Sequence, residues 1–292
     1  MISIKLMGGL GNQMFQICVA LACSIQYSMK LVIPYHSDMG DRRMYWDSFF
    51  KEMVEYTTEN PENQMTDANV MNMPVYIEKQ FKYCPIPDFK GGSIRLSGYF
   101  QSFKYFEAFQ ENILKILNIE NKKKEVLTKY SELFDSSGET VSIHFRLGDY
   151  KALRHYHPIM NYEYFEASLD HIMRTNRVTR VIYICEEEDN AYVESKIQLL
   201  KSKHPVEYVK VEDSIPDYDQ MLIMACCHHN IISNSSFSWW GAYLNDSASK
   251  VVCYPSVWFG EYFEHVFDYN DVTPSSWTKI EANPMNWRQP FV

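Results

Sequence analysis

The 292-residue chain has no excess of positive charge and no long apolar run, and each absence excludes a class of protein. Its formal net charge is -9, so nucleic acid, whose phosphates demand a basic face, is excluded as the main partner. The longest basic cluster, Lys122-Lys123-Lys124, is interpreted as the solvated face of a connector. No apolar stretch approaches the roughly 20 residues of a membrane-spanning helix.

The cysteines also lack a pattern. Their number, seven, is odd and they include no C-x-x-C pair, so the sequence predicts neither a disulfide framework nor a zinc site. The first residues run directly into a glycine turn, without the basic and apolar regions of a secretory signal. We therefore expect a reduced, cytoplasmic enzyme that meets a membrane at most through its substrate. With 46% hydrophobic and 22% charged residues, the chain has the composition of a globular protein, and it is long enough for two domains.

What the sequence does contain is an alternation of strands and helices. A strand over residues 2–7, a glycine turn, a helix over 12–29 and a strand over 31–34 predict the start of a doubly wound parallel sheet. Residues 35–92 show no usable periodicity. A strand or turn at 94–102 then precedes a helix that contains Phe106 and Leu117.

A polar stretch over 118–129 marks the expected domain boundary, so we predict an N-terminal domain of residues 1–130 and a C-terminal domain of residues 131–292. Beyond it, regular alternation predicts a second parallel α/β sheet that ends in an aromatic- and proline-rich terminal wrap. The expected strands cover 140–146, 178–185, 206–211, 229–234 and 250–254, and the expected helices cover 161–175, 189–202, 216–228 and 237–246.

The segment Asn234-Ser235-Ser236-Phe237 lies between an apolar strand and a helix that carries Trp239 and Trp240. Hydroxyl and amide side chains at a helix start, together with the backbone N–H groups there, can bind a diphosphate. The alternative is a serine cap on a helix whose tryptophan pair is only core. The segment alone leaves both interpretations open.

A second candidate is the turn Gly8-Gly9-Leu10-Gly11-Asn12-Gln13. Gly9 and Gly11 would let a ligand approach the backbone, and Asn12 and Gln13 add donors at the helix start. Met14 stands where the dinucleotide-binding fingerprint has its third glycine, so that fingerprint is excluded. A plain strand-to-helix connection remains the alternative.

The third candidate is the strand end Ser142–Tyr150. Alternation places His144 and Arg146 on one face, where the strand breaks at Gly148-Asp149. Ligands bind at the carboxyl ends of strands in open α/β sheets, and an arginine there can grip a phosphate with two hydrogen bonds. An Arg146–Asp149 ion pair that stabilises the turn is the alternative. We favour the ligand, because a buried histidine and arginine without a partner would be costly.

Two further patterns are considered as metal sites, and neither of them predicts one. Asp217-Tyr218-Asp219 has metal-binding spacing, but it follows Pro216 and opens an apolar helix, where acidic residues interact favourably with the helix dipole. The histidines at positions 155, 157, 228 and 229 lack the spacing of metal ligands.

Three of these segments together resemble the signatures of the α-1,2-fucosyltransferase family, glycosyltransferase family 11. The order and spacing of the signatures span nearly the whole chain. Gly98–Ser102, and His157 placed seven residues before Tyr164, are also similar to the family. Leu147 departs from the family pattern, in which two adjacent arginines follow the histidine, and this leaves Arg146 as the candidate arginine. The three signatures are Gly8–Gln16, His144–Tyr150 and Ser233–Ala242.

The resemblance implies a GT-B fold, in which two Rossmann-like parallel-sheet α/β domains face a cleft. The N-terminal domain would lie on the acceptor side and the C-terminal domain would bind GDP-β-L-fucose. Such enzymes transfer fucose with inversion, without a metal or another cofactor. The implied acceptor is a galactose-terminated oligosaccharide or glycolipid, through which the enzyme would be peripheral at a membrane, and the expected linkage is α-1,2 to the 2-hydroxyl of a β-galactoside.

The resemblance also implies roles for the candidate residues. Arg146 and the helix start would offset the charge that develops on the β-phosphate as GDP departs. His144 and Asp219 would contact guanine, and Gly9, Gly11, Asn12 and Gln13 would close on the donor from the other domain. Asp149 and His157 are the candidates for the base that accepts the acceptor's proton. The helix-start residues that would hold the leaving group are Asn234, Ser235, Ser236 and Phe237.

Two alternatives remain at this point. Phosphate and guanine contacts would not distinguish GDP-fucose from another GDP-sugar, such as one carrying rhamnose or colitose. The second alternative is a non-catalytic relative that binds a sugar nucleotide, and it is suggested by Leu147.

Overall fold

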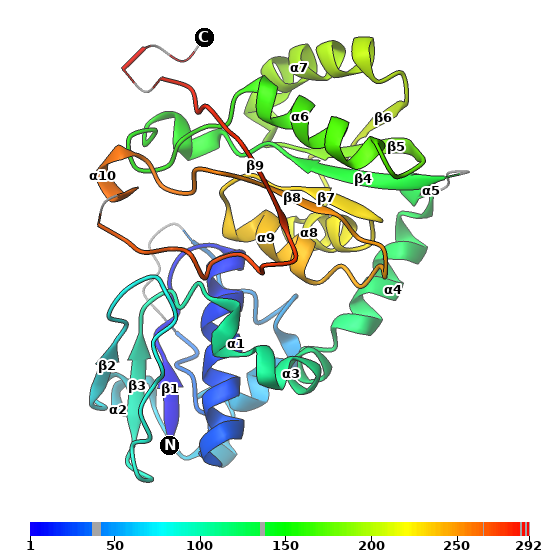
Figure 1. Cartoon of the computed structure of the whole chain (residues 1–292). Coiled ribbons are helices and arrows are strands. Elements are labelled where there is room, and N and C mark those ends of the chain that lie inside the picture. The colour runs from blue at the N-terminus through cyan, green and yellow to red at the C-terminus, as the bar shows by residue number, and fades with distance from the viewer. Residues whose placement is uncertain (37–41, 135–137, 265, 287, 290, 292) are drawn as a thin grey trace. The chain divides into compact units, whose positions relative to one another are not determined.

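The computed structural model describes residues 1–36, 42–134, 138–264, 266–286, 288–289 and 291 (Figure 1). The chain forms two compact units. The first comprises Met1–Asn121 and Phe267–Pro274, and the second comprises Lys122–Val266 and Ser275–Val292. The division thus falls after Asn121, within the polar stretch taken as the boundary, and a short part of the expected terminal wrap belongs to the first unit.

The second unit is built on a six-stranded sheet with the order β6-β5-β4-β7-β8-β9, in which every pair is parallel. Counted within this unit, the strand order is 3-2-1-4-5-6, that of a Rossmann fold. The order reverses between β4 and β7, which are neighbours. The strands are β4 (Glu139–His144), β5 (Val178–Ile184), β6 (Glu207–Lys210), β7 (His229–Ile231), β8 (Val252–Pro255) and β9 (Thr278–Ile280).

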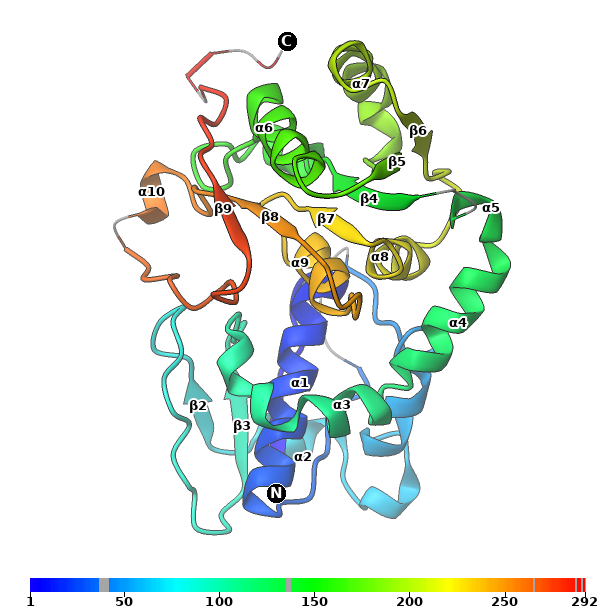
Figure 2. The ribbon, with the colours of Figure 1, turned by 45° about the vertical axis from the view of Figure 1, so that its right-hand side comes forward.

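Helices cover both faces of this sheet. In Figure 2, α6 (Tyr162–Met173) and α7 (Asn190–Lys203) lie on one face, and α8 (Asp217–Ala225) and α9 (Ser236–Tyr243) lie on the other. Short helices complete the unit, namely α5 (Ser131–Phe134), α10 (Glu261–Glu264) and the 3-10 turns η5 (Gly148–Lys151) and η6 (Glu187–Asp189). Most of the predicted elements of this half are therefore confirmed, with ends that differ by a few residues.

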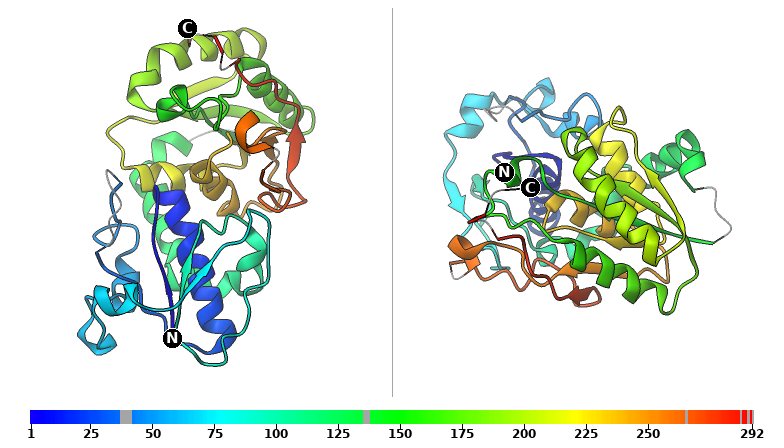
Figure 3. Two further views of the ribbon diagram at one scale, coloured as in Figure 1. Left: turned by 90° about the vertical axis from the view of Figure 1, so that its left-hand side faces the viewer. Right: turned by 90° about the horizontal axis from the view of Figure 1, so that it is seen from above.

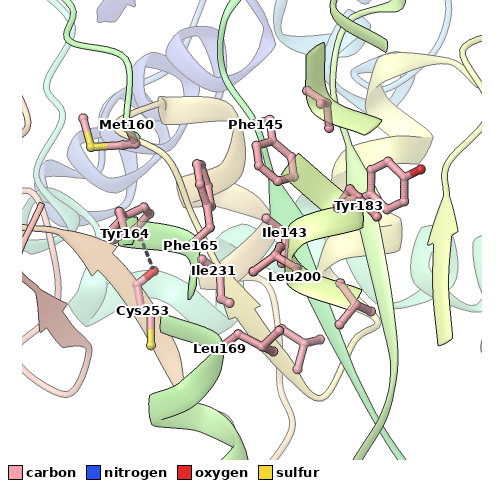
Figure 4. Close-up of a cluster of buried hydrophobic side chains, with 14 of the residues drawn as sticks. Ile143, Phe145, Met160, Tyr164, Phe165, Leu169, Tyr183, Leu200, Ile231 and Cys253 are labelled. Atoms are coloured by element: carbon pink, nitrogen blue, oxygen red, sulfur yellow. Dashed lines mark hydrogen bonds between the residues drawn. The ribbon is translucent and has the colours of Figure 1, made fainter. Parts of the chain in front are cut away.

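The core between β4, α6 and the neighbouring strands is apolar and close-packed (Figure 4). Phe145 packs on Phe165 with ring centroids 4.3 Å apart. The hydroxyl of the fully buried Tyr164 donates to the backbone carbonyls of Ile232 (2.6 Å) and Cys253 (3.2 Å). Helix α6 is thereby attached to the segment that follows β7 and to β8 itself.

On the other face, α9 packs closely on α8. Trp239 and Trp240 are both fully buried, so the tryptophan pair belongs to the core. A Cβ atom at Gly241 would lie 2.7 Å from Cβ of Met224, so only glycine permits this approach of the two helices. The close contact fixes the position of the α9 N-terminus relative to the sheet.

The first unit has a smaller parallel sheet with the order β1-β3-β2 and a long helix, α1 (Leu10–Tyr27), after β1 (Figure 3). Helix α1 is buried along most of its length, as its apolar sequence predicts. The other elements are β1 (Ile2–Ile4), β2 (Val75–Ile77), β3 (Ile94–Ser97), α2 (Asp67–Met71), α3 (Gln110–Ile116), η1 (Lys51–Tyr56), η2 (Pro61–Asn63), η3 (Phe103–Tyr105) and η4 (Glu107–Phe109).

Several expectations differ from the structure. Residues 31–34 form only isolated bridges, from Leu31 to Ile2 and from Ile33 to Thr57, rather than a full strand. Strand β2 lies in the region where the sequence showed no periodicity, and β9 lies in the expected terminal wrap. Both strands are three residues long, too short for alternation to be recognised.

The interpretation of the lysine run is wrong. The polar stretch is the helix α4 (Ile119–Lys129), in which Lys122 and Lys123 are buried. The ammonium of Lys123 pairs with Asp246 at 2.6 Å and donates to the carbonyl of Leu244 at 3.2 Å. A long lysine stem can be buried when its charged end finds such partners, which a solvated connector would not need. Among the described residues, no helix is both long and apolar enough to cross a bilayer.

Candidate functional site

The candidate site lies where the strand order of the second unit reverses. Strand β4 ends at His144 and the neighbouring β7 ends at Ile231, so the segments after both strands leave the same edge of the sheet. Ser233 ties these segments together. Its hydroxyl donates to the carbonyl of His144 at 2.6 Å and accepts from the N–H of Arg146 at 3.3 Å. Open α/β sheets bind ligands at such a point.

The N-terminus of α9 forms one side of this site. Ser235 is the cap of the helix, and its hydroxyl accepts from the N–H of Phe237 at 3.3 Å. The Ser238 hydroxyl lies 3.4 Å from the carbonyls of Ser233 and of Ser235. Ser235 is buried, whereas Ser236 and Phe237 are partly exposed. The positive end of the helix dipole therefore coincides with hydroxyl groups, a combination suited to an anion.

The two polar atoms of the Asn234 side chain differ in their hydrogen bonding. Its amide nitrogen donates to the carbonyl of Trp258 at 3.0 Å, and its side-chain oxygen is buried without a hydrogen bond from any residue that the structure describes. A buried acceptor that finds no partner is costly, so it points to a ligand or a water at this place.

His144 is buried and neutral. Burial lowers the pKa of its imidazole to about 3, and the nearby charge of Arg146 acts in the same direction. Its ring centroid lies 5.3 Å from that of Phe237. Within the described part of the chain, its Nδ1 atom has no hydrogen-bond partner. The histidine can therefore hydrogen-bond a ligand, but it adds no charge near neutral pH.

Arg146 follows β4 with its side chain 20% exposed and its guanidinium bound to two carboxylates, Asp149 and Glu186. The Arg146–Asp149 ion pair, considered above as an alternative to ligand binding, is thus present. An anionic ligand at this arginine must displace one of the carboxylates or share the guanidinium with it. Glu186 was missed in the sequence, although it follows β5, the next strand of the sheet, and so lies at the same carboxyl edge.

The two candidate bases, Asp149 and His157, both lie in the segment that follows Arg146. Asp149 accepts from the Arg146 guanidinium. The His157 imidazole stacks on the ring of Tyr150, with centroids 4.7 Å apart and planes at 20°. Burial holds the pKa of His157 below its usual 6.5, Arg146 and His155 lower it further, and Asp149 opposes them. His157 is therefore neutral at pH 7 and able to accept a proton.

Asp219 has hydrogen-bond partners other than the groups above. Its buried carboxylate accepts from Lys129 Nζ at 2.9 Å and from the Tyr130 hydroxyl at 2.7 Å, so it already has two partners at the start of α8. No contact among the described residues joins it to His144. Its expected contact with guanine remains a prediction.

The glycine turn of the first unit begins as expected but becomes helical early. Gly9 is the cap of α1, and Gly11 lies in the first turn of the helix. Gly8 has a φ of +75°, and a Cβ atom there would clash with the Asn12 amide nitrogen. The Asn12 side-chain oxygen accepts from Gln101 at 2.8 Å, so Asn12 attaches this turn to the segment after β3.

Gln13 lies inside the first unit. Its side chain is fully buried, and its amide nitrogen donates to the carbonyls of Gly8 (3.0 Å) and Arg43 (2.9 Å). In this arrangement Gln13 stabilises the turn itself. Its side-chain oxygen, which has no hydrogen-bond partner among the described residues, is the atom that could serve another group.

Within the described ranges, one group of acidic side chains could hold a metal ion, namely Glu186, Glu188 and Asp189. All three have basic partners. Lys151 pairs with Glu188 at 3.1 Å and with Asp189 at 2.5 Å, and Arg146 pairs with Glu186. We therefore interpret the group as an ion-pair network.

The model of Glycosyl transferase family 11 matches residues 1–281. The chain belongs to glycosyl transferase family 11. It is 25% identical to the O-antigen biosynthesis glycosyltransferase WbnK of Escherichia coli, over 87% of this chain and 93% of the relative. It is 26% identical to an alpha-1,2-colitosyltransferase of E. coli, over 95% and 98%. A galactoside 2-alpha-L-fucosyltransferase of Caenorhabditis elegans is 20% identical, over 99% and 79%.

Solved structures of glycosyltransferases share the fold of this family 11 chain. The ADP-heptose LPS heptosyltransferase II of E. coli superposes with a TM-score of 0.52 at 11% identity, covering 96% of this chain and 89% of that structure. POFUT1 in complex with GDP-fucose gives a TM-score of 0.50 at 10% identity, covering 86% and 97%. The expected GT-B fold is confirmed. The family 11 chain is a glycosyltransferase that uses a sugar-nucleotide donor.

Leu147 does not weaken this conclusion. Leu147 is 2% exposed and belongs to the apolar core, whereas Arg146 lies two residues beyond the end of β4 with its side chain 20% exposed. The departure from the family pattern leaves Arg146 and the start of α9 in place.

Proposed function

We propose that this glycosyltransferase moves L-fucose from GDP-β-L-fucose to the 2-hydroxyl of a β-galactoside, with inversion to an α-1,2 linkage. The observation that carries the proposal is the junction of Arg146 and the α9 N-terminus through Ser233, at the point where the strand order reverses. Two relatives support the linkage and the sugar class, since they are named as an alpha-1,2-colitosyltransferase and a galactoside 2-alpha-L-fucosyltransferase.

The chemistry is a single displacement. The acceptor oxygen forms a bond to C1 of fucose while the bond from C1 to the β-phosphate oxygen breaks, and GDP leaves with the electron pair. The negative charge that grows on the phosphate is offset by Arg146 and by the N–H and hydroxyl groups at the start of α9. In this proposal His144 and Asn234 add neutral hydrogen bonds to the donor.

The proton of the acceptor hydroxyl must move to a base. His157 suits this role because it is neutral at pH 7, and Asp149 is the second candidate. Asp149 already accepts from Arg146, so a donor phosphate that takes over this arginine would release the carboxylate. Inversion of the β-linked donor gives the α-linked product.

GDP-colitose is a second candidate donor, because the alpha-1,2-colitosyltransferase relative is 26% identical over 95% of this chain. Colitose is fucose without its 3-hydroxyl. A panel of GDP-L-fucose, GDP-colitose and GDP-rhamnose with one β-galactoside acceptor tests the choice. We expect the highest kcat/KM with GDP-fucose. A higher kcat/KM with GDP-colitose would make GDP-colitose the proposed donor. GDP binding without transfer from any donor would favour a non-catalytic protein.

We also expect transfer without a divalent metal, since the charge of the leaving GDP is offset by Arg146 and the α9 N-terminus. Excess EDTA should leave the rate within about twofold of the untreated enzyme, because cationic and dipolar groups can replace the metal's electrostatic role. The rate is measured before and after chelation and again after adding magnesium or manganese. Loss of activity that either ion restores would contradict this prediction and assign a metal to the acidic groups.

A further inference from the structure

We propose that Tyr150 is a positioning residue that holds Arg146 and the start of α9 in the arrangement that binds the donor. Tyr150 lies in the 3-10 turn η5, shortly after the end of β4 at His144 and four residues beyond Arg146. Three separate contacts join this side chain to groups of the candidate site. This inference rests on the proposed function, because it concerns the same diphosphate-binding groups.

The first contact is made by the hydroxyl of Tyr150, which donates to the backbone carbonyl of Asn234 at 3.1 Å. Asn234 immediately precedes the cap of α9. The bond therefore links the turn after β4 to the start of the helix after β7. Together with the bonds of Ser233, it gives the two segments a second connection, farther along the chain from β4.

The other two contacts are made by the aromatic ring. The guanidinium carbon of Arg146 lies over the ring, 4.9 Å from its centroid, which is within the range of a cation–π interaction. The imidazole of His157 stacks on the same ring. The ring thus limits the directions in which the guanidinium can move, including any movement from its two carboxylates to a phosphate.

The turn that carries Tyr150 is itself anchored. The N–H of Gly148 donates to the buried carboxylate of Asp189 at 2.9 Å, and Lys151 pairs with that same residue at 2.5 Å. The φ of Gly148 is +33°, and a Cβ atom there would clash with the Glu186 carboxylate. Because the turn is fixed at both ends, the position of Tyr150 can determine that of the Arg146 guanidinium.

The two parts of the side chain make separable contributions, which a set of variants can measure by the Kd of GDP. Tyr150→Phe removes the hydroxyl and keeps the ring, and we expect it to weaken GDP about threefold. Tyr150→Leu also removes the ring, and we expect a further weakening of about fivefold. Tyr183→Phe is the matched control, since its hydroxyl bonds Glu194 between β5 and α7, and its GDP affinity should not change.

A double-mutant cycle then identifies the partner of the ring. Tyr150→Phe and Tyr150→Leu differ in the ring alone, so their GDP affinities are compared once in the wild-type background and once together with Arg146→Ala. We expect the two variants to differ less than twofold in the second background, because the ring has lost its cation there. A ring effect of equal size in both backgrounds would overturn the inference.

Stability and kinetics distinguish positioning from a merely structural role. We expect kcat/KM for the donor to fall with Tyr150→Leu by about fifteenfold, in step with GDP affinity, in samples whose folded fraction is verified by circular dichroism. A lower melting temperature with unchanged GDP affinity and kcat/KM would overturn the inference. A wild-type protein that does not bind GDP would instead contradict the proposed function.

Discussion

Arg146→Ala should lower kcat/KM by about a hundredfold to a thousandfold, the usual cost of removing one preorganised donor from a developing negative charge. A second effect of Arg146→Ala should lower kcat/KM further. Without the guanidinium, Asp149 and Glu186 remain at the site and repel the diphosphate. Steady-state kinetics with GDP-fucose and a β-galactoside measure the effect. If the variant kept more than about a tenth of the wild-type kcat/KM, the loss would be far smaller than expected for such a donor, and the role of Arg146 would be contradicted.

Arg180→Ala provides the control for this variant. Arg180 lies near the beginning of β5, at the opposite end of the strand from Glu186, and its guanidinium bonds Glu207 and the carbonyls of Glu132 and Leu133. Its removal should lower the melting temperature but leave kcat/KM of the folded enzyme nearly unchanged. The two arginines thus separate an effect on the donor from an effect on stability.

Ser236→Asp should separate stability from activity in the opposite direction. A carboxylate in the first turn of α9 interacts favourably with the helix dipole, by about 0.3–1 kcal/mol, so the melting temperature should not fall. The same carboxylate would repel the diphosphate. At roughly 5 Å and an effective dielectric constant of about 20, two unit charges repel by about 3 kcal/mol, which corresponds to about a hundredfold in donor affinity.

Ser236→Asn is the matched variant, because asparagine has nearly the same shape as aspartate and no charge. Its KM for the donor should stay within about threefold of the wild-type value, since an asparagine at a helix start still supplies hydrogen bonds. Melting curves and KM values of the three proteins test the account together. Equal donor affinity for the aspartate and asparagine variants would place the diphosphate elsewhere.

The sequence predicted the second unit far better than the first, for a physical reason. Strand β5 (Val178–Ile184) is largely an apolar run because helices cover both faces of its sheet, and such a run is visible in the sequence. Strand β2 has only three residues, two of them exposed, and therefore no apolar run of useful length. In α4, Lys123 is buried with an acidic and a carbonyl partner, so a helix with a buried face has the composition of a solvated connector.

The candidate site was predicted in part. His144, Arg146 and the segment from Asn234 to Phe237 could be identified because polar residues directly follow apolar strands. Glu186 and the hydrogen bonds of Ser233 and Tyr150 could not be identified, because each depends on which strands are neighbours in the sheet. No local sequence pattern indicates the order β5-β4-β7. The hydrogen bond from Gln13 to the carbonyl of Arg43, thirty positions away, likewise has no local signal in the sequence.

The most direct test is the structure of the product formed from GDP-β-L-fucose and a β-galactoside such as lactose, determined by nuclear magnetic resonance. We predict one new fucosyl residue, in the α configuration, on the 2-hydroxyl of galactose. A β-linked product would contradict the single displacement, and a product at another hydroxyl would contradict the proposed linkage. If the enzyme formed no fucosyl product but transferred sugar from a different nucleotide, this would contradict the proposed donor.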